Sequence, residues 1–232
     1  MSGRPVDLRR HDRFFAPGGA GHPGGIDREV RGAQAARRRG ASPDPHGGLV
    51  STTAGHIEVA AGALVLLIGA AGSGKSTFAA RHFAPGDVIS SDQLRALIGE
   101  SESDQRANNE VFDRLQTLVR KRLVAGALTV VDATNTDWMR RAELIAMARR
   151  YHRPVLGIVF DLPLDICLSR IAGRLRTVGA AVVRQQVGDI HRDRERLDLE
   201  GFAAIYALGS TNQVEHVILE IKKGPVARAL SS

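Results

Sequence analysis

The segment LIGAAGSGKSTFAARHF, residues 67–83, constrains the fold of this chain more than any other stretch of its sequence. It reads as an apolar strand, a glycine-rich turn and then a helix. The spacing G-x-x-x-x-G-K-[ST], which marks a phosphate-binding loop, is matched by Gly69, Gly74, Lys75 and Ser76. A glycine-rich turn that matches by chance is the alternative, but the motif lies between a strand and a helix, the context that it requires. The segment therefore predicts a site for a nucleoside triphosphate.

Strand-like and helix-like segments alternate along the chain from residue 48 onward. Strands are expected at residues 63–69, 87–90, 127–134, 154–160 and 214–221. Helices are expected at residues 75–83, 108–126, 139–151 and, as one arginine-rich stretch, 163–196. Because strands joined by crossover helices pair in parallel, we expect an α/β fold with a five-stranded parallel sheet and helices on both faces.

Residues 1–47 differ in composition from the rest of the chain, since they are rich in Gly, Pro, His and Arg. Their sequence shows no sustained helical or strand period. Such a segment buries too little apolar surface to offset its ordering entropy, so we expect a disordered tail, followed by one folded domain at residues 48–232. Nine arginines against five acids leave the tail with a net charge of +4. An arm that binds nucleic acid, a start codon placed too far upstream and a plain solvated tail are the alternatives.

Composition narrows the class of protein. The formal net charge of the whole chain is +7, and its cations are mostly arginine. A basic balance favours polyanionic partners, although a GC-rich genome would also raise the arginine content. The single cysteine, Cys167, excludes an internal disulfide framework, and the most apolar run, residues 60–72, is too short to span a bilayer. The N-terminus does not resemble a secretory signal either, so we expect a cytoplasmic protein without membrane contact.

The loop motif assigns roles in binding ATP and Mg²⁺. Backbone N–H groups of residues 70–76 can surround the α- and β-phosphates at the start of the helix. Lys75 would reach the β- and γ-phosphates, and the Ser76 hydroxyl would bind Mg²⁺. The predicted nucleotide-binding residues are Gly69, Ala70, Ala71, Gly72, Ser73, Gly74, Lys75, Ser76 and Thr77.

A second motif, VISSDQLR at residues 88–95, follows the loop along the chain. Asp92 comes directly after a strand, at the carboxyl edge of the sheet where open α/β folds bind their ligands. There it could accept the proton of an attacking hydroxyl as a general base, and Arg95, one turn on, could hold a phosphate of the acceptor. The alternative makes Asp92 the N-cap of the next helix, a role that Ser90 or Ser91 could also fill.

A third motif, VVDATN at residues 130–135, ends another apolar strand. An acidic residue in this place is the usual partner of a phosphate loop in binding Mg²⁺, so Asp132 is the predicted second metal-binding residue. Thr134 and Asn135 could line the acceptor site, or they could cap the helix that follows.

Arginines in the stretch 163–196 are candidates for a lid that neutralises charge on the transferring phosphoryl group. Arg170 and Arg174 are four residues apart and would share one helix face, so both are assigned a catalytic role. Arg176 and Arg184 are further candidates. A solvated basic helix is the alternative, because acids accompany the later arginines of this stretch.

Taken in order, GAAGSGKSTFAARHF, DVISSDQLRALIGE and RLVAGALTVVDATN closely resemble the kinase module of bacterial polynucleotide kinase–phosphatase, an RNA-repair enzyme. The resemblance covers residues 57–222 approximately. It implies a P-loop kinase fold with the predicted strands in the order 2-3-1-4-5 and an arginine-rich lid. It also implies that Lys75 and Ser76 bind ATP and Mg²⁺, that Asp92 is the general base and that Arg95 binds the acceptor phosphate.

The resemblance predicts transfer of the γ-phosphate of ATP to the 5′-hydroxyl end of a polynucleotide. No segment corresponds to the phosphatase or ligase modules of that enzyme, so we expect a stand-alone kinase domain. A kinase of sugars or nucleoside-like compounds is the first alternative, because the same machinery serves small acceptors. A nucleotide-switched ATPase that acts as a binding module is the second. The choice between RNA and DNA and the oligomeric state are left open by the sequence.

Overall fold

The computed structural model describes residues 49–51, 55–98, 105–173 and 178–222, all of them in one compact unit, Pro43–Ser232. The predicted tail at residues 1–47 lies outside the described residues and stays a prediction. Arg174 and Arg176 lie outside them as well. No helix in the part of the chain that the structure describes is long and apolar enough to cross a membrane.

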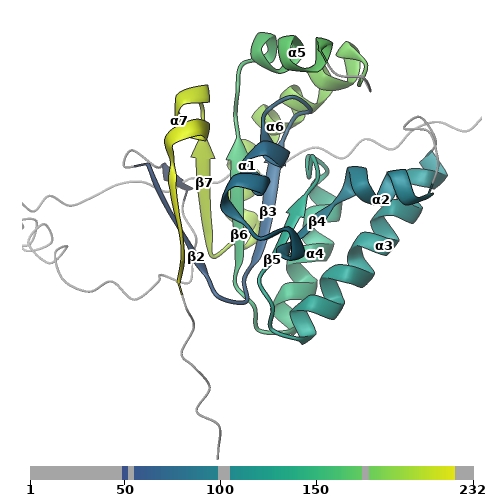
Figure 1. Cartoon of the computed structure of the whole chain (residues 1–232), viewed down its shortest axis with the longest axis vertical. Coiled ribbons are helices and arrows are strands. Elements are labelled where there is room, and N and C mark those ends of the chain that lie inside the picture. Colours follow the sequence, from purple (N-terminus) through teal and green to yellow (C-terminus); the bar gives the residue numbers. More distant parts are fainter. Residues whose placement is uncertain (1–48, 52–54, 99–104, 174–177, 223–232) are drawn as a thin grey trace, which may run out of the picture. The chain divides into compact units, whose positions relative to one another are not determined.

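A parallel sheet of six strands forms the centre of this unit (Figure 1). From one edge to the other its strands are β1 (Leu49–Ser51), β7 (Ala204–Leu208), β6 (Val155–Phe160), β3 (Leu64–Gly69), β5 (Thr129–Asp132) and β4 (Val88–Ser90). The first four predicted strands have the predicted order 2-3-1-4, as β4-β5-β3-β6, and β7 takes the fifth position, so the α/β P-loop kinase fold is confirmed. Strand β1 adds a sixth strand beside β7.

The prediction of the fifth strand at residues 214–221 is wrong. Residues there form the end of α7 (Thr211–His216) and β8 (Ile218–Lys222), which pairs with β2 (His56–Ala60) in a separate two-stranded sheet. Ser210 starts α7 because its hydroxyl accepts a hydrogen bond from the Gln213 N–H. The true fifth strand, β7, is more buried than β8, since the central sheet is covered by helices.

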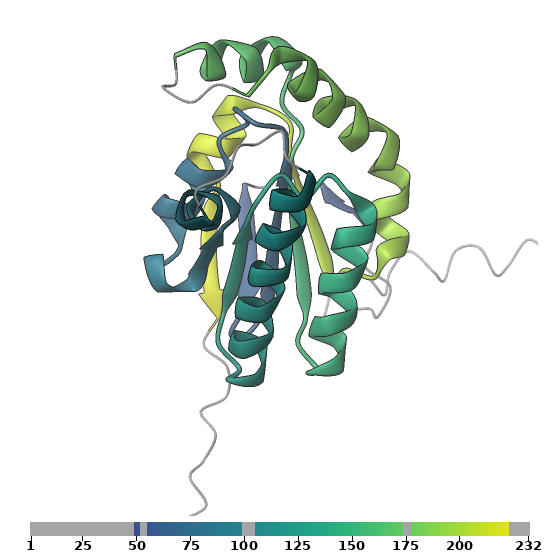
Figure 2. The ribbon, with the colours of Figure 1, turned by 90° about the vertical axis from the view of Figure 1, so that its right-hand side faces the viewer.

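Besides α7, the helices are α1 (Lys75–His82), α2 (Ser91–Ile98), α3 (Gln105–Val124), α4 (Trp138–Arg150), α5 (Leu164–Ala172) and α6 (Ala180–Glu200), with a 3₁₀ turn at Pro85–Asp87. The single helical stretch predicted at 163–196 is therefore two helices, α5 and α6. Helices α3 and α4 lie side by side on one face of the sheet (Figure 2), and α1 covers the other face (Figure 1).

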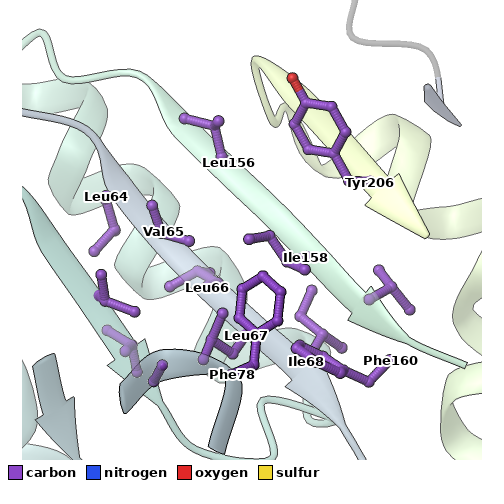
Figure 3. Packing of buried hydrophobic residues seen from close by; sticks show 14 of the residues in the cluster. Leu64, Val65, Leu66, Leu67, Ile68, Phe78, Leu156, Ile158, Phe160 and Tyr206 are labelled. Atoms are coloured by element: carbon purple, nitrogen blue, oxygen red, sulfur yellow. The ribbon is translucent and has the colours of Figure 1, made fainter. Parts of the chain in front are cut away.

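Strands β3 and β6 are buried along their whole length, and their side chains form the centre of the core (Figure 3). Phe78 on α1 packs edge-to-face against Phe160 at the end of β6, with ring centroids 5.3 Å apart. Burying an aromatic ring of this kind stabilises a fold by about 1.5–3 kcal/mol. This contact holds α1 against the sheet where the phosphate loop turns from β3 into the helix.

The three sequence motifs meet at the carboxyl edge of the sheet. Parallel pairing aligns Ser90 at the end of β4 with Asp132 at the end of β5, and Asp132 with Leu67 on β3. Because parallel strands all end on the same side, the segments that follow them lie next to one another. The fold thus places the phosphate loop, the Asp92 motif and the Asp132 motif together.

Candidate active site

Glycines give the phosphate loop its close turns. Gly72 and Gly74 have φ angles of 83° and 98°, which side chains rarely adopt. A Cβ atom on Gly72 would also collide with the carbonyl oxygen of Cys167 on α5. Burial raises the pKa of the Cys167 thiol, so this side chain is a neutral part of the core beneath the loop.

Lys75 is folded back over the N-terminal half of the loop. Its ammonium donates hydrogen bonds of 2.9 Å to the Gly69 carbonyl and 2.8 Å to the Ala70 carbonyl. The side chain is 7% exposed, which places a cation inside the site rather than in solvent. A buried ammonium held by carbonyl dipoles is prepared to bind phosphate oxygens.

A cavity of about 580 Å³ opens beside the loop. Most of the predicted site residues line it, namely Ala71, Gly72, Gly74, Lys75, Ser76, Asp92, Arg95, Asp132, Thr134 and Asn135. It also has an apolar wall, made by Val111, Phe112, Leu115, Val178 and Val182. Residues predicted from three separate motifs therefore share one cavity of a size suited to a small ligand.

Asp92 is not the N-cap of α2, because the helix begins one residue earlier. The Ser90 hydroxyl accepts a 3.4 Å hydrogen bond from the Gln93 N–H, as an N-cap does. The Asp92 side chain is 76% exposed, and its carboxylate lies 3.5 Å from the Arg95 guanidinium. Asp92 is therefore not needed to cap the helix, and its role as a general base stays a prediction.

Arg95 is held in place by a residue that the sequence did not reveal. Its guanidinium donates a 2.7 Å hydrogen bond to the side-chain oxygen of Asn108 on α3. The Arg95 side chain is only 16% exposed, and its Nε atom is buried with no hydrogen-bond partner among the described residues. A buried donor of this kind is costly unless a ligand or water uses it. Arg95 also lines the cavity, and its role in binding an acceptor phosphate stays a prediction.

Asp132 and Ser76 provide oxygen atoms of the kind that Mg²⁺ prefers. Asp132 ends β5 and is 7% exposed, and Ser76 lies in the first turn of α1 on the same cavity. The residues therefore fit a magnesium ion, which would be held by Ser76 and Asp132. Such an ion would supply positive charge beside the phosphates.

Asn135 has a structural role that the sequence did not indicate. It adopts a left-handed φ of 49°, and its side-chain nitrogen donates to the Leu67 carbonyl on β3 at 2.8 Å. The amide therefore fixes the segment after β5 to the sheet. Asn135 also lines the cavity, and its role in acceptor binding stays a prediction. Neither Thr134 nor Asn135 caps α4, because the Asp137 carboxylate accepts from the Met139 N–H at 2.9 Å. Thr134 lines the cavity, and its role in acceptor binding stays a prediction.

Arg141 on α4 forms a buried ionic network that the sequence analysis missed. Its side chain is 1% exposed and bonds to Glu200 at 2.6 Å and Asp193 at 3.0 Å, both on α6. It also donates to the Asn135 carbonyl at 2.9 Å. Burial alone would lower the pKa of the guanidinium, but the hydrogen bonds that it donates to Glu200 and Asp193 raise it above its ordinary value. The network joins α4, α6 and the segment after β5.

We expect substitution of Arg141 by methionine to lower the free energy of unfolding by about 3–5 kcal/mol, because it leaves two buried carboxylates without a cation. The measurement is urea denaturation followed by circular dichroism. Arg150→Met, an exposed arginine on the same helix, is the matched control and should change stability little. Equal stability of the Arg141 and Arg150 variants would show that the network does not support the fold.

The predicted lid arginines are only partly placed. Arg170 on α5 lies beside the loop, since a Cβ on Gly74 would be 3.4 Å from its guanidinium, and it is 3.9 Å from a Glu215 carboxylate oxygen. Arg170 does not line the cavity, and Arg184 on α6 is exposed. Another residue of α6, Gln186, contacts the loop, because its side-chain oxygen accepts a 2.8 Å hydrogen bond from the Ala71 N–H.

Three solved structures illustrate what the chain is similar to. The Pnkp1/Rnl/Hen1 RNA repair complex matches with 23% identity and a TM-score of 0.52, over 61% of this chain and 47% of that chain. This chain therefore spans about half the length of that protein. Kti12 of Chaetomium thermophilum in complex with ADP-AlF3 matches with 15% identity and a TM-score of 0.50, over 66% and 94% of the two chains. APS kinase CysC of Mycobacterium tuberculosis, in complex with AMPPNP and APS, has 17% identity and a TM-score of 0.42, over 67% and 94%.

At these identities the structural likeness shows the fold alone. No curated protein matches the chain. The family model AAA_33, an AAA domain, matches residues 64–197, which is more than half of the chain. The matched residues run from the start of β3 into the last turn of α6 and so include every residue that lines the cavity. The chain therefore belongs to the AAA domain family AAA_33 and has the P-loop kinase fold.

Proposed function

We propose that this protein is an ATP-dependent kinase that transfers the γ-phosphate to the 5′-hydroxyl end of a polynucleotide. The observation that carries the proposal is the pairing of Asp92 with Arg95 on the cavity that the phosphate loop also lines. Asp92 offers a carboxylate to accept the proton of an attacking hydroxyl. Arg95 offers a cation close by, for an acceptor that carries a phosphate of its own.

Four side chains of the cavity, together with the loop backbone, each have one part in this reaction. The loop N–H groups and Lys75 bind the phosphates of ATP, and Ser76 and Asp132 would hold Mg²⁺. Asp92 takes the proton of the 5′-hydroxyl as its oxygen bonds to the γ-phosphorus and the bond to the β-γ bridging oxygen breaks. ADP leaves with that oxygen. A mechanism of this kind depends on positioning and charge, so the buried cations matter more than any covalent chemistry.

Arg95 distinguishes the proposed acceptor from a neutral one. A 5′-hydroxyl nucleotide with a 3′-phosphate gives the Arg95 guanidinium a second anion to bind, whereas a neutral sugar adds none to the Asp92 carboxylate. The likeness to the RNA repair complex is consistent with a polynucleotide acceptor, although it rests on the fold. A small-molecule kinase is the second candidate, favoured by the size of the cavity, about 580 Å³.

The deciding experiment is transfer of radiolabelled γ-phosphate to 5′-hydroxyl DNA and RNA oligonucleotides, with nucleosides, nucleoside 3′-monophosphates and sugars as competitors. We expect a nucleoside 3′-monophosphate to be favoured over the bare nucleoside by about 1.5–3 kcal/mol, the value of a hydrogen bond to a charged group. Equal use of both compounds would contradict the polynucleotide acceptor and favour the small-molecule kinase. Release of phosphate at a rate that no acceptor changes would favour a nucleotide-switched ATPase.

Substitution of Arg95 by alanine should raise the KM for the oligonucleotide and leave the KM for ATP nearly unchanged, because the proposed partner of Arg95 is the acceptor and not the nucleotide. Arg114→Ala, on the exposed side of α3 and outside the cavity, is the matched control. A parallel rise in both KM values would show that Arg95 serves the nucleotide instead.

A further inference from the structure

We infer that Gln186 on α6 is a further ligand of the γ-phosphate of ATP, and that it distinguishes a bound triphosphate from a diphosphate. Helix α6 passes over the carboxyl edge of the sheet (Figure 2), and Gln186 lines the same cavity as Lys75 and Asp132. This inference rests on the proposed use of ATP but not on the proposed acceptor.

The contact with the loop determines which way the carboxamide faces. The Ala71 N–H can only donate, so its partner at 2.8 Å must be the side-chain oxygen of Gln186 and not the nitrogen. The two N–H bonds of that nitrogen are then directed elsewhere. Among the described residues the Gln186 nitrogen has no hydrogen-bond partner. Because the side chain lines the cavity, these donors are available to a ligand there.

The same peptide unit also contacts Lys75. The Ala70 carbonyl accepts from the Lys75 ammonium at 2.8 Å, and the Ala71 N–H of that unit donates to Gln186. In a phosphate loop this lysine reaches the β- and γ-phosphates, so the Ala70–Ala71 peptide lies near the terminal end of the triphosphate. Gln186 is thus placed at the γ-phosphate rather than at the base or ribose.

The hydrogen bonds run in one direction, from the Lys75 ammonium through the peptide unit to the Gln186 carboxamide. Each bond in such a chain polarises the next and strengthens it, most of all where water is excluded. The final donor is the Gln186 nitrogen, and a γ-phosphate oxygen is the acceptor that completes the chain. A neutral carboxamide can donate this hydrogen bond without adding a positive charge, and a positive charge would attract the phosphates of ADP as well as the γ-phosphate of ATP.

The test compares binding of ADP and of a non-hydrolysable ATP analogue, both with Mg²⁺, by isothermal titration calorimetry. Gln186→Met keeps the length of the side chain but removes both hydrogen-bonding groups. Gln186→Glu keeps an acceptor for the Ala71 N–H but removes the donors and adds a negative charge. Gln185→Met, the neighbouring and exposed glutamine, is the matched control.

We expect Gln186→Met to lower the affinity for the triphosphate analogue roughly tenfold or more, because a donor to a charged group is lost. The affinity for ADP should stay nearly unchanged. Gln186→Glu should weaken the analogue further, since its charge repels the γ-phosphate. Three results would overturn the inference: unchanged affinities, equal losses for both nucleotides, or normal triphosphate binding by the glutamate variant. Failure of wild-type protein to bind either nucleotide would overturn it together with the use of ATP, whereas failure to phosphorylate an oligonucleotide would contradict the acceptor alone.

Discussion

Substitution of Lys75 by alanine is expected to lower the rate of phosphoryl transfer by roughly 10²–10³ or more, the loss seen when one electrostatic contact to the reacting group is removed. The Lys75 ammonium is the buried cation next to the loop, within 2.9 Å of two loop carbonyls. Without it, the β- and γ-phosphates would keep the N–H groups of the loop but lose the cation that the Gly69 and Ala70 carbonyls hold beside them. The reaction would then lose both substrate affinity and stabilisation of the transferring group.

The measurement is ATP turnover with a saturating acceptor, together with the melting temperature. Lys121→Ala is the matched control, because Lys121 is an exposed lysine on α3 that does not line the cavity. The fold of the Lys75 variant should persist, since the core between β3, β6 and α1 does not include this side chain. Near-normal turnover of the Lys75 variant would show that the loop does not bind the phosphates of ATP.

Substitution of Asp92 by asparagine should lower the rate by roughly 10²–10⁴, the usual contribution of a general base, with little change in stability. The carboxylate is 76% exposed and its contact with Arg95 is 3.5 Å long, so removing its charge should change the free energy of unfolding by less than about 1 kcal/mol. Asparagine keeps the size of the side chain but cannot take the proton of an attacking hydroxyl.

Ser90→Ala is the matched variant for the Asp92 experiment. Ser90 caps α2, so its loss should lower stability by about 0.5–2 kcal/mol while chemistry continues. The Asp92 variant should therefore lose rate and keep its melting temperature, whereas the Ser90 variant should keep its rate and lose melting temperature. Preserved turnover of the Asp92 variant with a lower melting temperature would assign Asp92 a structural role and contradict its role as a base.

Much of the site could be predicted because its parts are local in sequence. The loop needs Gly72 and Gly74 for left-handed backbone, and Lys75 and Ser76 at the start of the helix, all within a few residues. Polar residues at strand ends, such as Asp132, could be placed because parallel strands end on one side of a sheet. The alternation of strands and helices along the sequence was therefore enough to predict that these motifs meet at one edge of the sheet.

The C-terminal part of the fold was harder to predict from local patterns. Residues 214–221 have apolar residues in a strand-like run, but Ser210 starts a short helix there and β8 pairs with β2, far away in the sequence. The strand that joins the central sheet is β7, only five residues long. Strand β8 has the same length, so the pairing partner and not the local pattern decides which of the two joins the central sheet.

Side chains from α6 were the residues most clearly missed. Asp193 looks like one acid in a solvated charged face, yet it meets the buried Arg141 across 52 positions of sequence. Gln186 looks like surface, yet it contacts Ala71 across 115 positions. No periodicity marks such a residue, because α6 alternates charged and polar side chains on several faces.

The sequence by itself determined the family of folds, the nucleotide loop and the motifs at the carboxyl edge, because backbone conformation and strand direction depend on neighbouring residues. Only the tertiary structure decided that Ser90 and not Asp92 caps α2, that Asn108 holds Arg95, and that α6 reaches the loop through Gln186. The physical reason is that a hydrogen bond between distant segments depends on how helices pack on the sheet. That packing is set by the whole core and not by the residues that form the bond.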